Sequence, residues 1–289
     1  MEYVFGLIIF LFGAALGSFI NVIADRFNTG LSPWKGRSFC FSCSTVLRRS
    51  DLVPLFSFLF LRGKCRYCRS KIPDGVFVIE ILMGILSLLA AFKSGLLISD
   101  FSIIHNSYLL IQYFLLTSIF ATLLLITIYD LRHFIIPDTF LLIFLLFSFL
   151  YNSHFVIFDS SPLSFARGGV GGGVVSGIFL ALPFLLIFLI SRGRWIGFGD
   201  IKYIAVIGFF LGFAEGLSAV IFSFWIGAAF SLLALVLRKI KPHIYLPLMQ
   251  NKLTIKSEIP FGPFLSLGTV LSFYFNADIF QINSLLQMF

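Results

Sequence analysis

Eight apolar runs divide the sequence, and they constrain its fold more than any other feature. A membrane-spanning helix needs roughly 20 mostly apolar residues. Hydrophobic residues make up 59% of this 289-residue chain and charged residues only 12%, whereas charged residues make up about 25% of a typical soluble domain. We therefore predict an all-α polytopic membrane protein with about eight transmembrane helices. The runs lie near 4–24, 76–92, 107–129, 139–158, 170–190, 201–214, 217–237 and 259–275.

The basic residues indicate how these helices are oriented, because cytoplasmic segments near helix ends retain Lys and Arg. With the N-terminus outside, the inner segments are 25–75, 130–138, 191–202 and 238–258, and they hold 19 of the 21 Lys and Arg residues. The net charge of +8 is then mostly a signal of topology, and it also favours membrane lipid with anionic headgroups. We expect no nucleic-acid partner.

Segment 25–75 is the longest predicted extramembrane segment, and it carries all four cysteines. They form two CxxC pairs, Cys40 with Cys43 and Cys65 with Cys68. Such paired spacing is typical of structural Zn²⁺ sites with four thiolate ligands. The alternative, two disulfides, is disfavoured in the reducing cytoplasm. Four thiolates leave no open position for substrate, so we expect a small zinc-binding lobe in which the metal folds the loop and does not catalyse.

Two aspartates stand at the ends of apolar runs. Asp130 closes the third run, where the helix dipole disfavours a negative charge, and Asp200 opens the sixth. The chain crosses the membrane twice between them, so both return to the cytoplasmic leaflet. One carboxylate of such a pair can deprotonate a water while the other, protonated, polarises a peptide carbonyl. Because no Ser-His-Asp order or HExxH motif is visible, an aspartyl intramembrane-type protease is the leading hypothesis.

Other polar and small residues have candidate supporting roles. Gly197 and Gly199 flank Phe198 before Asp200, and we expect them to let the backbone bend and a substrate strand approach that acid. Glu80 lies about one turn inside the second run. It is either a functional acid at membrane depth or an acid favoured by the helix dipole, and both interpretations stay open. Asp138 follows a proline and precedes an apolar run, which predicts a helix N-cap.

Glycines spaced four residues apart along a helix predict close packing against a neighbouring helix. Gly169, Gly173 and Gly177 repeat at this spacing in the fifth run, and Gly17 with Ser18 ends the first. Small residues of this kind let helices approach closely in a membrane.

A competing hypothesis from another class is a cation transporter or channel. Glu80, Asp130 and Asp200 would then line an ion path, as acids inside membranes often do. This hypothesis predicts ion flux and no cleavage of a peptide.

The motifs together resemble those of type IV prepilin peptidases, the bifunctional leader peptidases and N-methyltransferases of the GxGD aspartyl protease group, family A24. One departure is the segment 131–135, Leu-Arg-His-Phe-Ile, where a more polar segment is expected; it bears on substrate preference and leaves both aspartates in place. The resemblance covers nearly the whole chain and rests on Gly17-Ser18-Phe19 with Asn21, Val22 and Arg26, the two CxxC pairs, 61–66, Asp130 with Ile136-Pro137-Asp138, 197–202 and 259–264.

The resemblance implies a function, a cofactor and a division of the chain. Asp130 and Asp200 would cleave the basic leader from type IV prepilins or pseudopilins after Gly at the cytoplasmic membrane face. S-adenosylmethionine would then donate the methyl group to the new N-terminus. Residues 1–24 would be the first transmembrane helix, 25–75 the four-cysteine domain linked to methylation, and 76–289 the membrane-embedded peptidase domain.

The resemblance also implies a location. We expect a multi-pass protein of the bacterial inner membrane, with the active site and the cysteine loop on the cytoplasmic side, serving a type IV pilus or type II secretion. The sequence predicts no particular oligomeric state.

Overall fold

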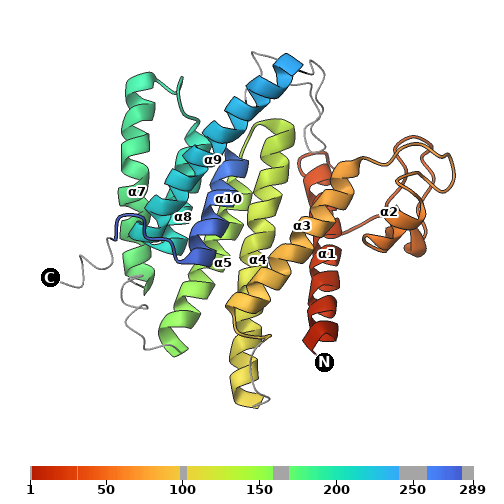
Figure 1. Ribbon diagram of the computed structural model, residues 1–289, viewed down its shortest axis with the longest axis horizontal. Helices are drawn as coiled ribbons and strands as arrows, with labels where there is room; N and C mark the ends of the chain where they lie inside the picture. The colour runs from red at the N-terminus through yellow and green to blue at the C-terminus, as the bar shows by residue number, and fades with distance from the viewer. Residues whose placement is uncertain (1, 31, 98–102, 159–168, 241–258, 282–289) are drawn as a thin grey trace. The chain divides into compact units, whose positions relative to one another are not determined.

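The apolar runs form helices in the computed structural model, which describes residues 2–30, 32–97, 103–158, 169–240 and 259–281 (Figure 1). Within these residues the protein is all-helical apart from turns, loops and two isolated β-bridges. Eight long helices correspond one for one to the predicted runs. They are α1 Glu2–Arg26, α3 Asp74–Lys93, α4 Ile103–His133, α5 Asp138–Phe158, α7 Gly169–Ser191, α8 Phe198–Leu211, α9 Phe213–Ile240 and α10 Gly262–Phe275.

Not all of these helices are long enough to cross a bilayer on length and composition. Five candidate spans lie in the described residues: Val4–Arg26, Asp74–Lys93, Ser107–His133, Gly172–Ser191 and Phe213–Ala234. Asp138–Ser153 and Gly262–Phe275 are shorter apolar helices. A helix of 14 residues, such as α8, is only about 21 Å long. The predicted count of about eight spans therefore stays a prediction.

The chain folds as two compact units. Among the described residues, those up to Ile128 form the first unit and those from Tyr129 onward form the second. The boundary falls near the end of α4, so that Asp130 belongs to the second unit. The four cysteines and Glu80 belong to the first.

In the first unit, α1 and α3 lie side by side (Figure 1) because small residues face each other. A Cβ added to Gly17 would lie 2.9 Å from the carbonyl oxygen of Ile79, and one added to Gly13 would lie 2.5 Å from Cβ of Ser87. These distances are too short for real Cβ atoms. The prediction that Gly17 serves close helix packing is confirmed.

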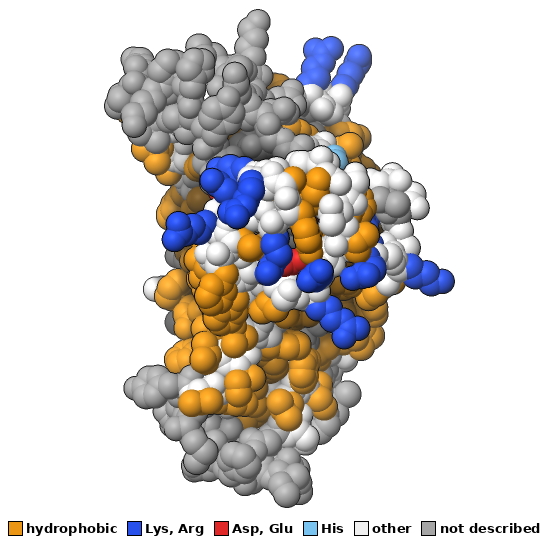
Figure 2. All heavy atoms as spheres, turned by 90° about the vertical axis from the view of Figure 1, so that its right-hand side faces the viewer, with side chains coloured by type: hydrophobic (Ala, Val, Ile, Leu, Met, Phe, Trp, Pro, Cys, Tyr) orange, Lys and Arg blue, Asp and Glu red, His pale blue; other side chains and the backbone are white. Residues whose placement is uncertain are grey.

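The four-cysteine lobe occupies the connection between α1 and α3, as predicted. It contains the short helices η1 (Arg49–Leu52) and α2 (Phe56–Phe60). Arg26, at the end of α1, donates hydrogen bonds to the carbonyl oxygens of Ser32, Lys35 and Arg37, which fixes the chain where it enters the lobe. On this lobe, Lys and Arg side chains surround hydrophobic ones on the face that Figure 2 shows.

In the second unit, α7 packs closely on α8. A Cβ on Gly177 would lie 2.5 Å from the carbonyl oxygen of Ala205, and one on Gly173 would lie 2.8 Å from that of Phe209. The predicted packing role is confirmed for these two glycines. The side-chain surroundings of Gly169 lie outside the described residues.

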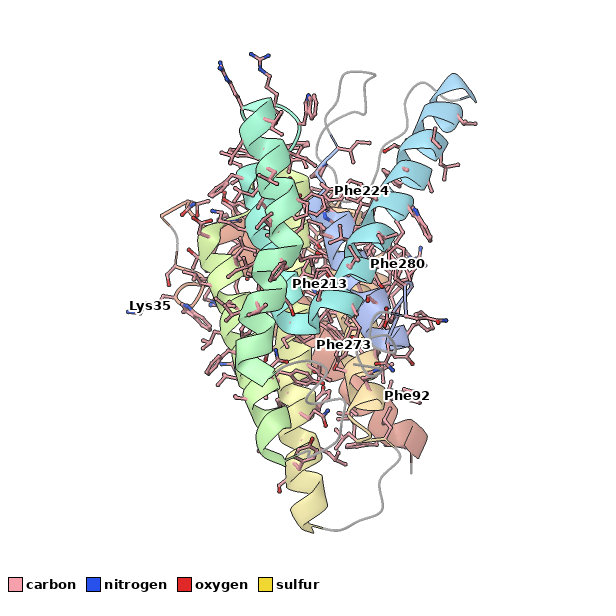
Figure 3. All side chains as sticks on the ribbon, turned by 90° about the vertical axis from the view of Figure 1, so that its left-hand side faces the viewer. Lys35, Phe92, Phe213, Phe224, Phe273 and Phe280 are labelled. Carbon is pink, nitrogen blue, oxygen red and sulfur yellow. The ribbon has the colours of Figure 1, made fainter. Side chains whose placement is uncertain are left out.

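Aromatic rings fill the core of the second unit. Phe210 of α8 stacks on Phe273 of α10, with ring centroids 5.2 Å apart, and Phe144 of α5 meets Phe210 edge-on at 5.9 Å. Phe224 of α9 lies 5.0 Å from Phe261, so the residue before α10 is held against α9. Figure 3 labels Phe224 and Phe273 on their helices.

The break between α8 and α9 falls at a single glycine. Gly212 has φ 80° and ψ −179° and ends α8, and α9 begins at the next residue. Only glycine adopts this backbone conformation without strain. The predicted boundary lay between 214 and 217, a few residues later than the observed break.

Candidate carboxylate site and candidate metal centre

Asp130 lies in the last turn of α4, and only 4% of its surface is exposed. Its Oδ2 atom accepts a hydrogen bond of 2.9 Å from the backbone N–H of Gly262. Gly262 is the first residue of α10, and the first N–H groups of a helix have no partner within that helix. A Cβ at Gly262 would lie 2.6 Å from the same oxygen, so the contact requires glycine.

Asp200 is the third residue of α8 and lies in its first turn. Its carboxylate reaches back to the backbone N–H of Gly197, the N-cap residue. This is the return half of a capping box, in which the acid at the third helical position satisfies the N-cap N–H. Local geometry therefore fixes where the Asp200 side chain points.

The second unit brings these two carboxylates within electrostatic reach of each other. The loop between α4 and α5 helps to set this approach, because Gly199 packs against Ile136. A Cβ added to Gly199 would lie 3.4 Å from the Cβ of Ile136. Each carboxylate has one backbone N–H donor, and each donor comes from the N-terminal end of a helix.

Neither of the two glycines before Asp200 has a backbone conformation that requires glycine. Gly197 has φ −73° and ψ 143°, values that any residue adopts, and Gly199 is helical. A Cβ at Gly197 would lie 3.2 Å from Oδ2 of Asp200. The expected bend of the backbone at these glycines is therefore not seen. Close packing against the carboxylate applies to Gly197 alone, because the contact of Gly199 with Ile136 is an ordinary one.

A charged pair lies beside this site. Lys202 donates to Asp138, which is the first residue of α5 and not the N-cap that the sequence predicted. The Lys202 ammonium also lies 5.2 Å from the centre of the Phe198 ring. These contacts tie the start of α8 to the start of α5.

The sequence did not predict the hydrogen bonds that hold Gly262, the residue that donates to Asp130. Tyr203 of α8 is fully buried and forms a 2.8 Å hydrogen bond with Ser266 of α10, whose hydroxyl in turn donates to the carbonyl oxygen of Gly262. A weak signal was available, because Tyr203 follows Asp200 by three positions and so lies on the same helix face. No local signal connects Asp130 to Gly262, which are 132 positions apart.

The four cysteines meet at one point in the lobe, with their sulfur atoms all within 4.8 Å of one another. Each CxxC pair lies in a tight turn closed by one antiparallel bridge, Phe39 with Val46 and Lys64 with Lys71. The two turns repeat each other, since Ser44 and Arg69, which follow the second cysteine of each pair, both have positive φ.

The donor set fits a zinc ion. Sulfurs bound tetrahedrally at about 2.3 Å from zinc lie about 3.8 Å apart, and the Sγ atoms of Cys40 and Cys68 are separated by 3.8 Å. Hydrogen bonds from the backbone N–H groups of Cys43 and Ser42 lower the pKa of Cys40 to about 6, which favours the thiolate that a metal requires. No disulfide joins the four cysteines, all of which are free thiols.

Hydroxyl groups at matching positions accompany the sulfurs. Thr45 lies 3.3 Å from the sulfur of Cys43, and Ser70 lies 3.0 Å from that of Cys68. Both follow the second cysteine of their pair by two residues, a pattern visible in the sequence that the sequence analysis did not use.

Glu80 is buried in α3, with 5% of its surface exposed. Its Oε2 accepts the backbone N–H of Leu55 at 2.7 Å, and its carboxylate also accepts the hydroxyl of Ser18. Glu80 therefore joins α1, α3 and the lobe within the first unit.

Comparison with known proteins covers both units. Residues 11–94 match the family described as the bacterial peptidase A24 N-terminal domain, and residues 117–232 match the type IV leader peptidase family. A relative from Bacillus subtilis (strain 168), named prepilin leader peptidase/N-methyltransferase, is 30% identical over 94% of this chain and 95% of its own length.

Relatives with the same name occur in other bacteria. The one from Legionella pneumophila is 29% identical over 94% of this chain and 92% of its own, and the one from Burkholderia pseudomallei (strain K96243) is 26% identical over 98% and 88%. No solved structure is significantly similar to the chain. These matches do not favour the alternative of a cation transporter or channel.

Proposed function

Because this chain belongs to the type IV leader peptidase family, we propose that it cleaves the leader from prepilins or pseudopilins and then methylates the new N-terminus. It is an enzyme of the prepilin peptidase class, and its apolar helices make it a multi-pass membrane protein. The cleavage mechanism, the site residues and the methylation step are our proposals.

The observation that carries the peptidase proposal is the approach of Asp130 to Asp200. Two carboxylates in a poorly hydrated site share a proton, because both cannot easily ionise. The ionised member removes a proton from a water, which attacks the peptide carbonyl that the protonated member polarises. The dyad then gives a proton to the leaving nitrogen as the C–N bond breaks, which releases a carboxylic acid and an amine. The N–H groups of Gly262 and Gly197 each donate to one of the carboxylates, which would orient both carboxylates for this reaction.

The substrate follows from the names of the relatives. A prepilin would keep its basic leader in the cytoplasm and its apolar helix in the bilayer, with the bond after Gly at the membrane face. The predominance of Lys and Arg in segments 25–75, 130–138, 191–202 and 238–258 supports a cytoplasmic site in the bacterial inner membrane with the N-terminus outside.

The lobe at 25–75 serves methylation in this proposal, and 76–289 serves cleavage. Cys40, Cys43, Cys65 and Cys68 would hold a Zn²⁺ ion, whose contribution is to keep the loop folded. S-adenosylmethionine would be the methyl donor. A segment as short as 25–75 can bury only a small hydrophobic core of its own, so a bound metal would contribute much of its folding free energy.

The test is cleavage of a prepilin by the full-length protein in membranes. Asp130→Asn and Asp200→Asn should each abolish the shift in product size while the protein stays inserted. Asp74→Asn is the matched control, because Asp74 is an exposed acid that forms an ion pair with Lys71. Processing by either dyad variant at the wild-type rate would refute the proposed site.

A further inference from the structure

Glu80 is a buried carboxylate that the proposed cleavage step does not use. In a membrane helix a leucine at this position would cost less than an acid. The acid is therefore unfavourable for α3 alone, and its use has to lie in its contacts. Those contacts are the hydroxyl of Ser18 in α1 and the backbone N–H of Leu55 in the lobe.

The contact at Leu55 holds a strained turn. Leu55 has φ 62° and ψ −52°, and the N–H of Phe56 donates to the carbonyl oxygen of Pro54 at 2.6 Å. This is a γ-turn with positive φ at its centre, a rare and strained form. A non-glycine residue keeps such a conformation only where its surroundings enforce it.

The contacts that hold Leu55 come from α3 and from the lobe itself. Its side chain is buried, its N–H is bound by Glu80, and α2 follows immediately. Phe58 of α2 stacks on Phe77 of α3, with ring centroids 4.8 Å apart. Glu80 and Phe77 lie on α3 about one turn apart, and both contact the segment 54–60, Glu80 at Leu55 and Phe77 at Phe58.

We propose that Glu80 is a positioning residue that fastens the four-cysteine lobe to α1 and α3 by holding the γ-turn at Leu55. The ligands Cys40, Cys43, Cys65 and Cys68 form their own cluster, so the metal folds the lobe and Glu80 sets where the folded lobe sits. Its consequence for methylation rests on the function proposed above.

The direct test is amide hydrogen exchange of residues 53–61 in the full-length, zinc-loaded protein. Glu80→Leu removes the acceptor and should accelerate exchange there by about tenfold or more, the effect of losing a hydrogen bond to a charged group. Glu80→Gln keeps an oxygen acceptor and should stay near the wild-type rate. Zinc content should be unchanged in both variants.

A matched control is Ser87→Ala. Ser87 is also buried in α3, and its hydroxyl bonds to the carbonyl oxygen of Ile9 in α1 and to the hydroxyl of Tyr113 in α4, so these hydrogen bonds are made to helices and not to the lobe. This variant should leave exchange at 53–61 unchanged. Unaltered exchange in Glu80→Leu, or equal acceleration in Ser87→Ala, would overturn the proposal. If Glu80→Leu fails to insert, Ser18→Ala provides the same readout, with a smaller acceleration expected and its absence contradicting the proposal.

Activity separates this inference from the proposed function. With prepilin as substrate, Glu80→Leu should lower the methylated fraction of the product severalfold. The cleavage rate should stay within about twofold of wild type, since Glu80 belongs to the first unit whereas Asp130 and Asp200 belong to the second. Faster exchange at 53–61 with an unchanged methylated fraction would support the fastening role of Glu80 and count against a role of the lobe in methylation.

Discussion

At the scale of single residues, the site depends on what each carboxylate touches. Asp130 of α4 accepts a hydrogen bond from the N–H of Gly262 in another helix, α10. Asp200 accepts one from the N–H of Gly197, the N-cap of its own helix α8. The orientation of Asp130 therefore depends on Gly262, and a substitution there acts on the reaction through that carboxylate.

Gly262→Ala should impair cleavage strongly. The new Cβ would lie 2.6 Å from Oδ2 of Asp130, so the carboxylate or α10 must move, and a displacement of about 1 Å can cost about 100-fold in rate. Gly227→Ala is the control, because its Cβ would meet Phe264 at an ordinary 3.4 Å. Initial rates of prepilin cleavage compare the two, and equal rates would show that the Gly262 contact has no role in the reaction.

Asp51 gives the lobe a dependence on pH. Desolvation by burial raises the pKa of Asp51, but hydrogen bonds from the Arg48 N–H, Tyr67 and Arg66 and the charge of Arg66 outweigh it, and the net pKa is lowered. A lowered pKa in the folded state stabilises the lobe fully above the unfolded pKa of about 3.9, and this contribution is lost as the pH falls through the folded value.

Asp51→Asn should therefore destabilise the lobe at pH 7 and differ less from wild type below about pH 4. Limited proteolysis of the lobe across this range measures the difference, with Asp74→Asn as a control for an exposed acid. If the difference in proteolysis rate between Asp51→Asn and wild type stayed constant down to pH 3, the role given to Asp51 would be contradicted.

At the scale of helices, glycine packing decides how closely neighbours approach. Gly177→Val should push α7 away from α8, because even its Cβ would lie 2.5 Å from the carbonyl oxygen of Ala205. We expect a loss of about 1–3 kcal/mol in the free energy of unfolding. Thermal unfolding in detergent measures it, and Val at Gly6, whose Cβ would have only one neighbour at 4.0 Å, should have little effect.

The sequence predicted helices well and their connections poorly. Long apolar runs identify helices because a membrane requires backbone groups to be satisfied within each segment, and each of the eight runs became one helix. The short elements η1 and α2 and the bridged turns around the cysteines carry too few residues for any period to show. Parity of membrane crossings predicted that Asp130 and Asp200 approach, but the N–H of Gly262 depends on tertiary packing that no local pattern encodes.

At the scale of the whole molecule, the proposed function predicts that the lobe and the dyad can be separated experimentally. Chelation of the metal should unfold the lobe, because binding free energy is folding free energy in such sites. Methylation of a cleaved pilin should then fall to background while cleavage continues. Mass spectrometry of the product N-terminus with and without chelator reports both reactions at once, and equal loss of the two would mean that the lobe supports the whole enzyme.

The claim at the centre of this account is that Asp130 and Asp200 act as one catalytic unit. Groups that act together are strongly non-additive when removed. Cleavage rates of Asp130→Asn, Asp200→Asn and the double variant, measured on one prepilin, test this directly. We predict that all three are reduced to the same background. The opposite result would be a single variant that retains substantial cleavage activity and a double variant whose rate falls by the product of the two single effects. That result would contradict the claim, because it would mean that the two aspartates act independently.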